Sequence, residues 1–106
     1  MKPNRVLLVP EAREQARVIA AWWRENRPQA PRLFEEELSH ALALLAGASK
    51  VGHPYPHPRR RGVRRLLLRS TRYHVYYRTQ GDEVVVLAIW SALRGTGPDL
   101  RGTAGT

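Results

Sequence analysis

Arginine is the residue type in this chain that points most clearly to a chemical role. Lys2 and Lys50 are the only lysines among eighteen cationic residues, so sixteen are arginine, and the formal net charge is +9. A guanidinium pairs through two parallel hydrogen bonds with a phosphate or a carboxylate, and its flat face stacks on aromatic rings. Between Glu37 and Asp82 the sequence holds nine cations and no acid. This pattern indicates recognition of an acidic partner, either nucleic acid or an acidic protein, although a purely solvated basic surface would leave the same pattern.

Other residue types offer less chemistry. His53 and His57 are four residues apart, but the prolines between and after them exclude the helix that would aim both imidazoles at one metal ion. The serines and histidines form no known nucleophile motif, and the chain has no glycine-rich phosphate loop. We therefore predict neither a metal nor a cofactor. Because the chain has no cysteine and no apolar stretch near the roughly 20 residues of a membrane span, we expect a cytoplasmic protein without a membrane partner.

Hydrophobic spacing, together with the positions of proline and glycine, predicts the helices and strands that hold these arginines. A chain of 106 residues fits a single domain. The pattern predicts a strand, two amphipathic helices that form an antiparallel hairpin, and three strands, at residues 5–9, 10–27, 31–47, 63–69, 72–79 and 83–90. We expect an α+β fold over residues 1–94, with an N-terminal strand, a helical hairpin and a three-stranded antiparallel sheet.

Three further expectations concern the regions around these elements. The prolines and glycines of residues 48–62 predict a loop without strand, and those of residues 95–106 predict a flexible tail. The last strand is apolar on both faces, so it should lie centrally in the sheet. Glu35, Glu36 and Glu37 should face solvent near the start of the second helix, where they favour the helix dipole.

Alternation along the strands divides their side chains between two faces of the sheet. The helical hairpin should cover one set, which consists of Leu66, Leu68, Tyr73, Val75 and Tyr77. The other set should be exposed, and it consists of Arg65, Leu67, Arg69, Arg72, His74, Tyr76 and Arg78. Cations interleaved with rings are typical of surfaces that pair with phosphates and stack on bases.

The order of elements and several short motifs resemble the RelE/ParE superfamily of toxins from bacterial toxin–antitoxin pairs. The resemblance spans about residues 5–94. It rests on Val9-Pro10-Glu11-Ala12, on Phe34 with Leu38, Ala41 and Leu45, on Val63-Arg64-Arg65-Leu66, on Tyr73-His74-Val75-Tyr76-Tyr77, and on Val84 to Trp90 leading to Arg94.

The resemblance implies one of two activities. Members of the superfamily either cut messenger RNA in the ribosomal A site or, in the ParE branch, poison DNA gyrase, and a cognate antitoxin wraps and silences them. The positions of the nuclease residues fall on Arg65, Leu67, His74, Arg94 and a position near Leu100. Leucine thus replaces one cation and the terminal tyrosine, and Ser91 stands where many relatives carry a histidine. These departures favour the ParE branch.

We therefore predict a ParE-like toxin that inhibits growth by binding DNA gyrase rather than by catalysis and that a cognate antitoxin neutralises. The residues expected to bind target or antitoxin are Arg64, Arg65, Arg69, Arg72, Tyr76, Arg78, Trp90 and Arg94. One alternative is an endoribonuclease that acts on ribosome and mRNA, with Arg65, His74 and Arg94 as its catalytic residues. A second alternative is a nucleic-acid-binding module without toxicity.

Overall fold

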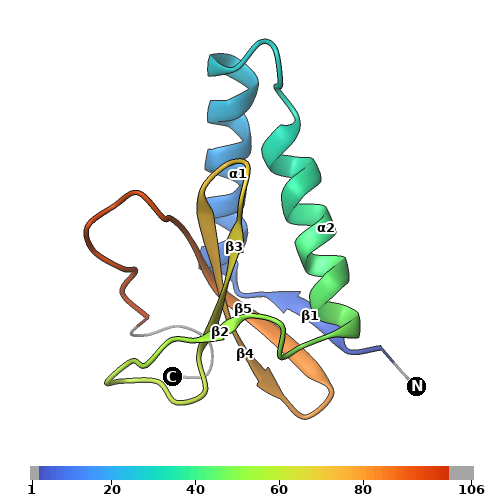
Figure 1. Cartoon of the computed structure of the whole chain (residues 1–106), viewed down its shortest axis with the longest axis vertical. Helices are drawn as coiled ribbons and strands as arrows, with labels where there is room; N and C mark the ends of the chain where they lie inside the picture. The colour runs from blue at the N-terminus through green and yellow to red at the C-terminus, as the bar shows by residue number, and fades with distance from the viewer. Residues whose placement is uncertain (1–2, 101–106) are drawn as a thin grey trace.

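A computed structural model describes residues 3–100 of the chain. Figure 1 shows two helices standing side by side over a twisted sheet. The elements in chain order are β1 (Arg5–Leu8), α1 (Pro10–Asn26), α2 (Leu33–Gly47), β2 (His53–Pro54), β3 (Arg64–Leu68), β4 (Tyr73–Gln80) and β5 (Glu83–Ser91). This order confirms the α+β fold with an N-terminal strand and a helical hairpin.

The start of α1 and the end of α2 lie where local sequence chemistry predicts, whereas α2 begins at Leu33, two residues after the predicted start at Pro31. Pro10 opens α1, where a missing amide costs nothing, and Glu11 follows in the positive first turn. The helix ends two residues before Pro28. The second helix buries one apolar stripe against the sheet, made of Phe34, Leu38, Ala41 and Leu45.

The sheet has five strands in the order β1-β5-β4-β3-β2. The three-stranded antiparallel part expected from the sequence is present as β3, β4 and β5. The sheet is nevertheless mixed, because β1 pairs with β5 in parallel. Strand β5 therefore lies between β1 and β4, and residues 84–89 are all buried, which confirms the predicted central position.

The predicted loop contains a short strand that the sequence did not indicate. His53 and Pro54 pair antiparallel with Arg65 and Arg64, so the prediction of no strand in residues 48–62 is wrong at these two positions. Proline is compatible with this place because the strand is at the edge of the sheet, where an amide is not needed on the outer side.

The two faces predicted by strand alternation are confirmed along β3 and β4. Arg65 lies opposite Tyr76 and Leu67 lies opposite His74 on one face. The other face packs under the helices, where the ring of Phe34 meets the ring of Tyr73 edge-on at 5.3 Å between centroids. A bulge shifts the register between Tyr76 and Tyr77 on β4, opposite β5.

One of the three consecutive glutamates does not face solvent as predicted. The carboxylate of Glu37 accepts hydrogen bonds from the amide of Ser70 at 2.7 Å and from the amide and hydroxyl of Thr71 at 2.9 and 2.6 Å. Glu37 therefore ties α2 to the turn between β3 and β4. The prediction failed because these donors lie more than thirty residues away in the sequence.

Residues 95–100, which we call the strap, fold back over the sheet face opposite the helices. The indole amide of Trp90 donates to the carbonyl oxygen of Thr96 at 2.8 Å, and the side chain of Leu100 is fully buried. The strap is thus not a free extension of the domain, while residues 101–106 of the predicted tail lie outside the described residues. One consequence is that Tyr76, predicted to be exposed, is only 2% exposed.

Candidate functional site

Three predicted residues from three parts of the chain converge on one cavity beneath the strap. Arg65 comes from β3, His74 from β4, and Arg94 from the chain after β5. They line a cavity of about 320 Å³, which we call the strap cleft. Its walls are completed by Tyr55, Tyr76, Ser91, Ala92 and residues 95–97.

Arg65 is held in this cleft by aromatic side chains. Its guanidinium carbon lies 5.0 Å from the centroid of the Tyr55 ring, within range of a cation–π interaction. A guanidinium nitrogen also donates to the hydroxyl of Tyr76 at 3.5 Å. The rings of Tyr55 and Tyr76 meet edge-on at 4.9 Å. These contacts orient Arg65 without neutralising its charge.

The two titratable groups beside Arg65 are shifted by their surroundings. Partial burial lowers the pKa of His74, and the charges of Arg65 and Arg72 lower it further, so the neutral imidazole is favoured. Burial raises the pKa of Tyr76, although the hydrogen bond from Arg65 opposes this shift. The Tyr76 hydroxyl therefore keeps its proton at neutral pH. The cleft thus combines permanent positive charge with uncharged rings, which suits an anionic ligand.

Arg94 lies at the mouth of the strap cleft. Its guanidinium carbon is 4.6 Å from the centroid of the Trp90 ring, and the side chain is exposed. Trp90 lies opposite His74 on the neighbouring strand, and its indole holds the strap through Thr96. Arg94 is thus positioned by Trp90 while its donors stay available to a partner.

The other predicted binding residues have separate locations. Arg64 points to the opposite side of β3 and donates to the carbonyl oxygens of Lys50 and Gly52 at 3.2 and 2.6 Å, which orders the loop before β2. Arg69 and Arg72 are exposed in the turn between β3 and β4, where Arg72 adopts a positive φ of 67°. Arg78 is half-buried and lines a separate cavity with Arg60.

Tyr55 is a site residue that the sequence analysis missed. It lies in the proline-rich loop, and its amide donates to the carbonyl oxygen of Val63 at 2.8 Å, which brings its ring over Arg65. An aromatic residue flanked by prolines gives no local signal of a role in a site. The neighbouring His57 stacks near Tyr55 and accepts a hydrogen bond from the amide of Arg59, so it does not converge with His53.

Comparison with known proteins identifies the family. The sequence matches the family described as "ParE toxin of type II toxin-antitoxin system, parDE" over residues 6–95. The chain belongs to the ParE toxin family. A chain in the solved structure titled "Chromosomal ParDE TA system from P. aeruginosa" has a TM-score of 0.68 and 18% sequence identity, covering 83% of this chain and 95% of that chain. This ParE likeness shows a shared fold. No curated protein matches the sequence significantly.

Among residues 3–100, no helix is long and apolar enough to cross a membrane. Within the same residues, the ion pairs involve Arg5, Arg17 and Arg24, and none involves an arginine of the strap cleft. The positive charge of Arg65 and Arg94 is therefore free to act on a partner.

Proposed function

We propose that this ParE-family toxin inhibits growth in the cytoplasm by binding DNA gyrase and that a cognate antitoxin neutralises it. The strap cleft is the proposed contact with the target, with Arg65 and Arg94 pairing with an anionic surface and Trp90 and Tyr55 supporting them. No step of bond cleavage is needed for this action.

The observation that carries the proposal is the shortage of proton-accepting groups in a cleft rich in positive charge. Leu67 places an apolar side chain opposite His74 on the same face of the sheet. Tyr76 is buried with a raised pKa, so its hydroxyl is a poor base. Cleavage of RNA by the adjacent 2′-hydroxyl needs a base, an acid for the leaving group and charge stabilisation. For these three tasks the cleft offers His74 as a base, the protonated hydroxyls of Tyr55 and Tyr76 as acids, and arginines for charge stabilisation.

The test is to induce the protein and to follow two readouts in the same cells. Binding to gyrase should inhibit supercoiling by the purified enzyme, cause DNA damage and produce filamentous cells. Primer extension on cellular messages should show no new cuts. Codon-phased cuts within minutes of induction, with supercoiling unaffected, would reject the gyrase proposal.

A ribosome-dependent endoribonuclease is the second candidate, because one observation favours it. Arg65, His74 and Arg94 line a single cleft, and the lowered pKa of His74 leaves a neutral imidazole that can accept a proton. His74→Ala separates the two candidates. Loss of His74 should abolish cleavage of messages if the protein is a nuclease, whereas it should leave most inhibition of gyrase.

A further inference from the structure

Arg78 on β4 carries a positive charge that residues 3–100 leave without a counter-charge. Its guanidinium nitrogen Nε is buried and has no hydrogen-bond acceptor within these residues. The ion pairs of the same residues involve other arginines. Burial of a donor on a cation is costly without an acceptor, so such a group calls for an explanation. A bound anion would supply the acceptor.

Arg78 lines a cavity of about 470 Å³, which we call the Arg78 cavity. Leu7 on β1 and Arg78 on β4 both lie opposite Val85 on β5. Because side chains at paired positions lie on the same face of a sheet, these three form a row across neighbouring strands. The lining is completed by Leu8, Val9, Arg60 and Gln80. Among the described residues, none that lines the cavity is acidic.

A turn of three consecutive arginines brings a second cation to this cavity. The amide of Arg59 donates to Nδ1 of His57 at 3.1 Å, which helps to order the turn. Arg60 lines the cavity, and its Nε donates to the carbonyl oxygen of Leu100 at 3.2 Å. Arg59 and Arg61 are exposed on either side of it. Positive charge therefore continues from the cavity to the surface of the turn.

We propose that the Arg78 cavity binds a phosphate group and that a nucleic-acid strand supplies it. A guanidinium can pair with two phosphate oxygens at once through two of its nitrogens, so a phosphate gives the buried Nε of Arg78 an acceptor. The charge of Arg60 adds to the attraction, and the apolar side chains of Leu7 and Val85 screen it less than water does. The two exposed arginines of the turn favour a strand over a free phosphate ester, because a strand carries further phosphates for them.

This site is separate from the strap cleft. Among the described residues, the two cavities share no lining side chain. The inference goes beyond the proposed function and does not depend on it, because binding of phosphate can be measured without gyrase. Under the proposed function, the DNA on which gyrase acts is one strand that this site could hold.

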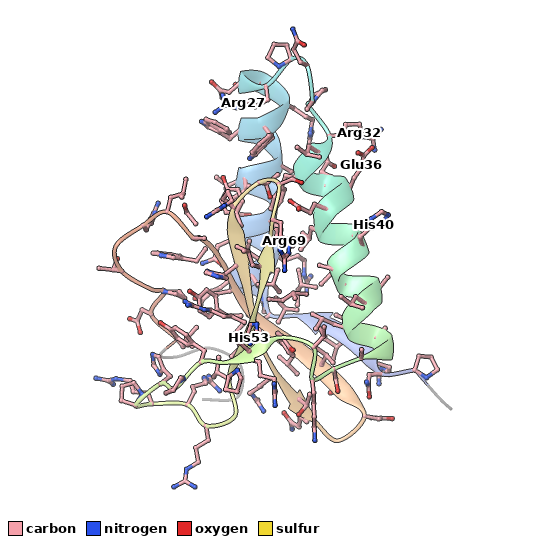
Figure 2. The ribbon with its side chains drawn as sticks, in the orientation of Figure 1. Arg27, Arg32, Glu36, His40, His53 and Arg69 are labelled. Carbon is pink, nitrogen blue, oxygen red and sulfur yellow. The ribbon has the colours of Figure 1, made fainter. Side chains whose placement is uncertain are left out.

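The test compares Arg78→Gln with Arg32→Gln, which lowers the net charge by the same amount. Figure 2 shows Arg32 at the start of α2, at the end of the helical hairpin away from the sheet. Within residues 3–100, its side chain makes no hydrogen bond that caps this helix. The probes are pyrophosphate, followed by calorimetry, and a fluorescent single-stranded DNA oligonucleotide, followed by anisotropy. Arg78→Gln should bind both probes at least about tenfold more weakly than Arg32→Gln, because a desolvated charge contact is lost.

Two further measurements separate the site from net charge and from folding. Arg78→Lys keeps the net charge but lacks the planar fork of donors, so it should also bind both probes more weakly than the unaltered protein. In NMR spectra of the unaltered protein, the Nε–H resonance of Arg78 should shift when pyrophosphate is added. Arg78→Gln should melt no lower than the unaltered protein, because it removes a buried charge that has no partner within residues 3–100.

The two probes also distinguish the sources of the phosphate. Weaker binding of DNA by Arg78→Gln, with DNA bound more tightly than pyrophosphate by the unaltered protein, supports the site with a strand as its ligand. Pyrophosphate bound as tightly as DNA, and lost in Arg78→Gln, supports the same site with a free phosphate ester as its ligand. Equal binding by Arg78→Gln and Arg32→Gln, or an Arg78 resonance that neither probe moves, would overturn the site and leave the proposed function standing.

Discussion

The Glu37 carboxylate accepts three hydrogen bonds from Ser70 and Thr71, which we call the Glu37 clamp. This clamp provides the sharpest test of what holds the β3–β4 turn against α2. Replacing Glu37 with glutamine keeps the size of the side chain and removes its negative charge. The three hydrogen bonds to Ser70 and Thr71 then lose one acceptor oxygen, because the amide nitrogen of glutamine is itself a donor. The turn that carries Arg69 and Arg72 loses its tie to α2.

The size of the effect can be worked out from these bonds. A hydrogen bond to a charged group contributes about 1.5–3 kcal/mol to stability. Glu37 is only partly buried, and glutamine keeps one acceptor, so the three contributions do not add in full. We expect a loss of about 2 kcal/mol in the free energy of unfolding. For a domain of this size, that loss lowers the melting temperature by about 8 °C.

The dependence on pH gives a second signature. Partial burial raises the pKa of Glu37, but the bonds from Thr71 and Ser70 lower it by more, so the folded pKa lies below the unfolded value of about 4.3. The stabilisation is therefore complete above the unfolded pKa and is lost as pH falls through the folded pKa. The difference in stability between Glu37 and Glu37→Gln should be full at pH 7 and should close in acid.

Thermal and urea unfolding between pH 3 and pH 7 measure both effects. Glu36→Gln is the matched control, because Glu36 is exposed one position earlier on α2 and its side chain makes no hydrogen bond within residues 3–100. We expect a change of about 0.5 kcal/mol or less in this control. Equal melting of the two variants at pH 7, or a gap that does not narrow in acid, would refute the clamp.

Three further predictions concern the strap cleft. Arg94→Ala should fold with a loss of about 1 kcal/mol or less in the free energy of unfolding, because an exposed cation–π contact is worth about 0.5–1 kcal/mol. The variant should nevertheless lose most growth inhibition in a plasmid-based assay. A stable and fully toxic variant would place the site elsewhere. NMR titration should give His74 a pKa below about 6.5. Arg65→Gln should raise this pKa only in part, because the burial of the imidazole remains. Since the folded pKa is lower than the unfolded one, the free energy of unfolding should fall as pH drops from about 6.5 towards the folded pKa. Gly97→Ala should move the strap, because its new methyl group would collide with the Tyr55 hydroxyl, and this movement should shift the NMR resonance of the Trp90 indole amide. Gly95→Ala is the control, because a methyl group at Gly95 meets nothing within 4 Å and should leave that resonance unchanged.

Much of the fold could be predicted because its signals are local. These signals are the start of α1 at Pro10, the apolar stripes at helical spacing and the short breaks between strands, and each acts within a few residues. The parallel pairing of β1 with β5 could not be predicted in this way, since it joins the two ends of the domain. The hydrogen bonds of Glu37 to the β3–β4 turn could not be predicted either, because they also join residues far apart in the sequence. Local sequence reasoning predicts a solvent-facing carboxylate at this position.

The candidate site also has features that local sequence patterns predict and features that they do not. Alternation along the strands places Arg65 and His74 on one face, and the family resemblance adds Arg94. Three of the residues that line the strap cleft could therefore be predicted from the sequence. The burial of Tyr76 was not, because it depends on how closely the strap can approach. Gly97 allows that approach, since a side chain there would collide with Tyr55. Glycine therefore allows close packing in the strap, and the flexibility expected for residues 95–106 as a whole stays a prediction.

Strand β3 shows why residue type alone does not assign a role in this protein. Its even-numbered residues Leu66 and Leu68 face the helices, whereas Arg65 faces the strap cleft and Leu67 lines the groove between β3 and α2. A substitution at Arg65 disturbs two surfaces, because its side chain lines both the cleft and the groove, while a substitution at Leu67 disturbs one. Neighbouring residues of one strand therefore lie on the core, the strap cleft and the groove, and the surface that each group faces decides what a substitution changes.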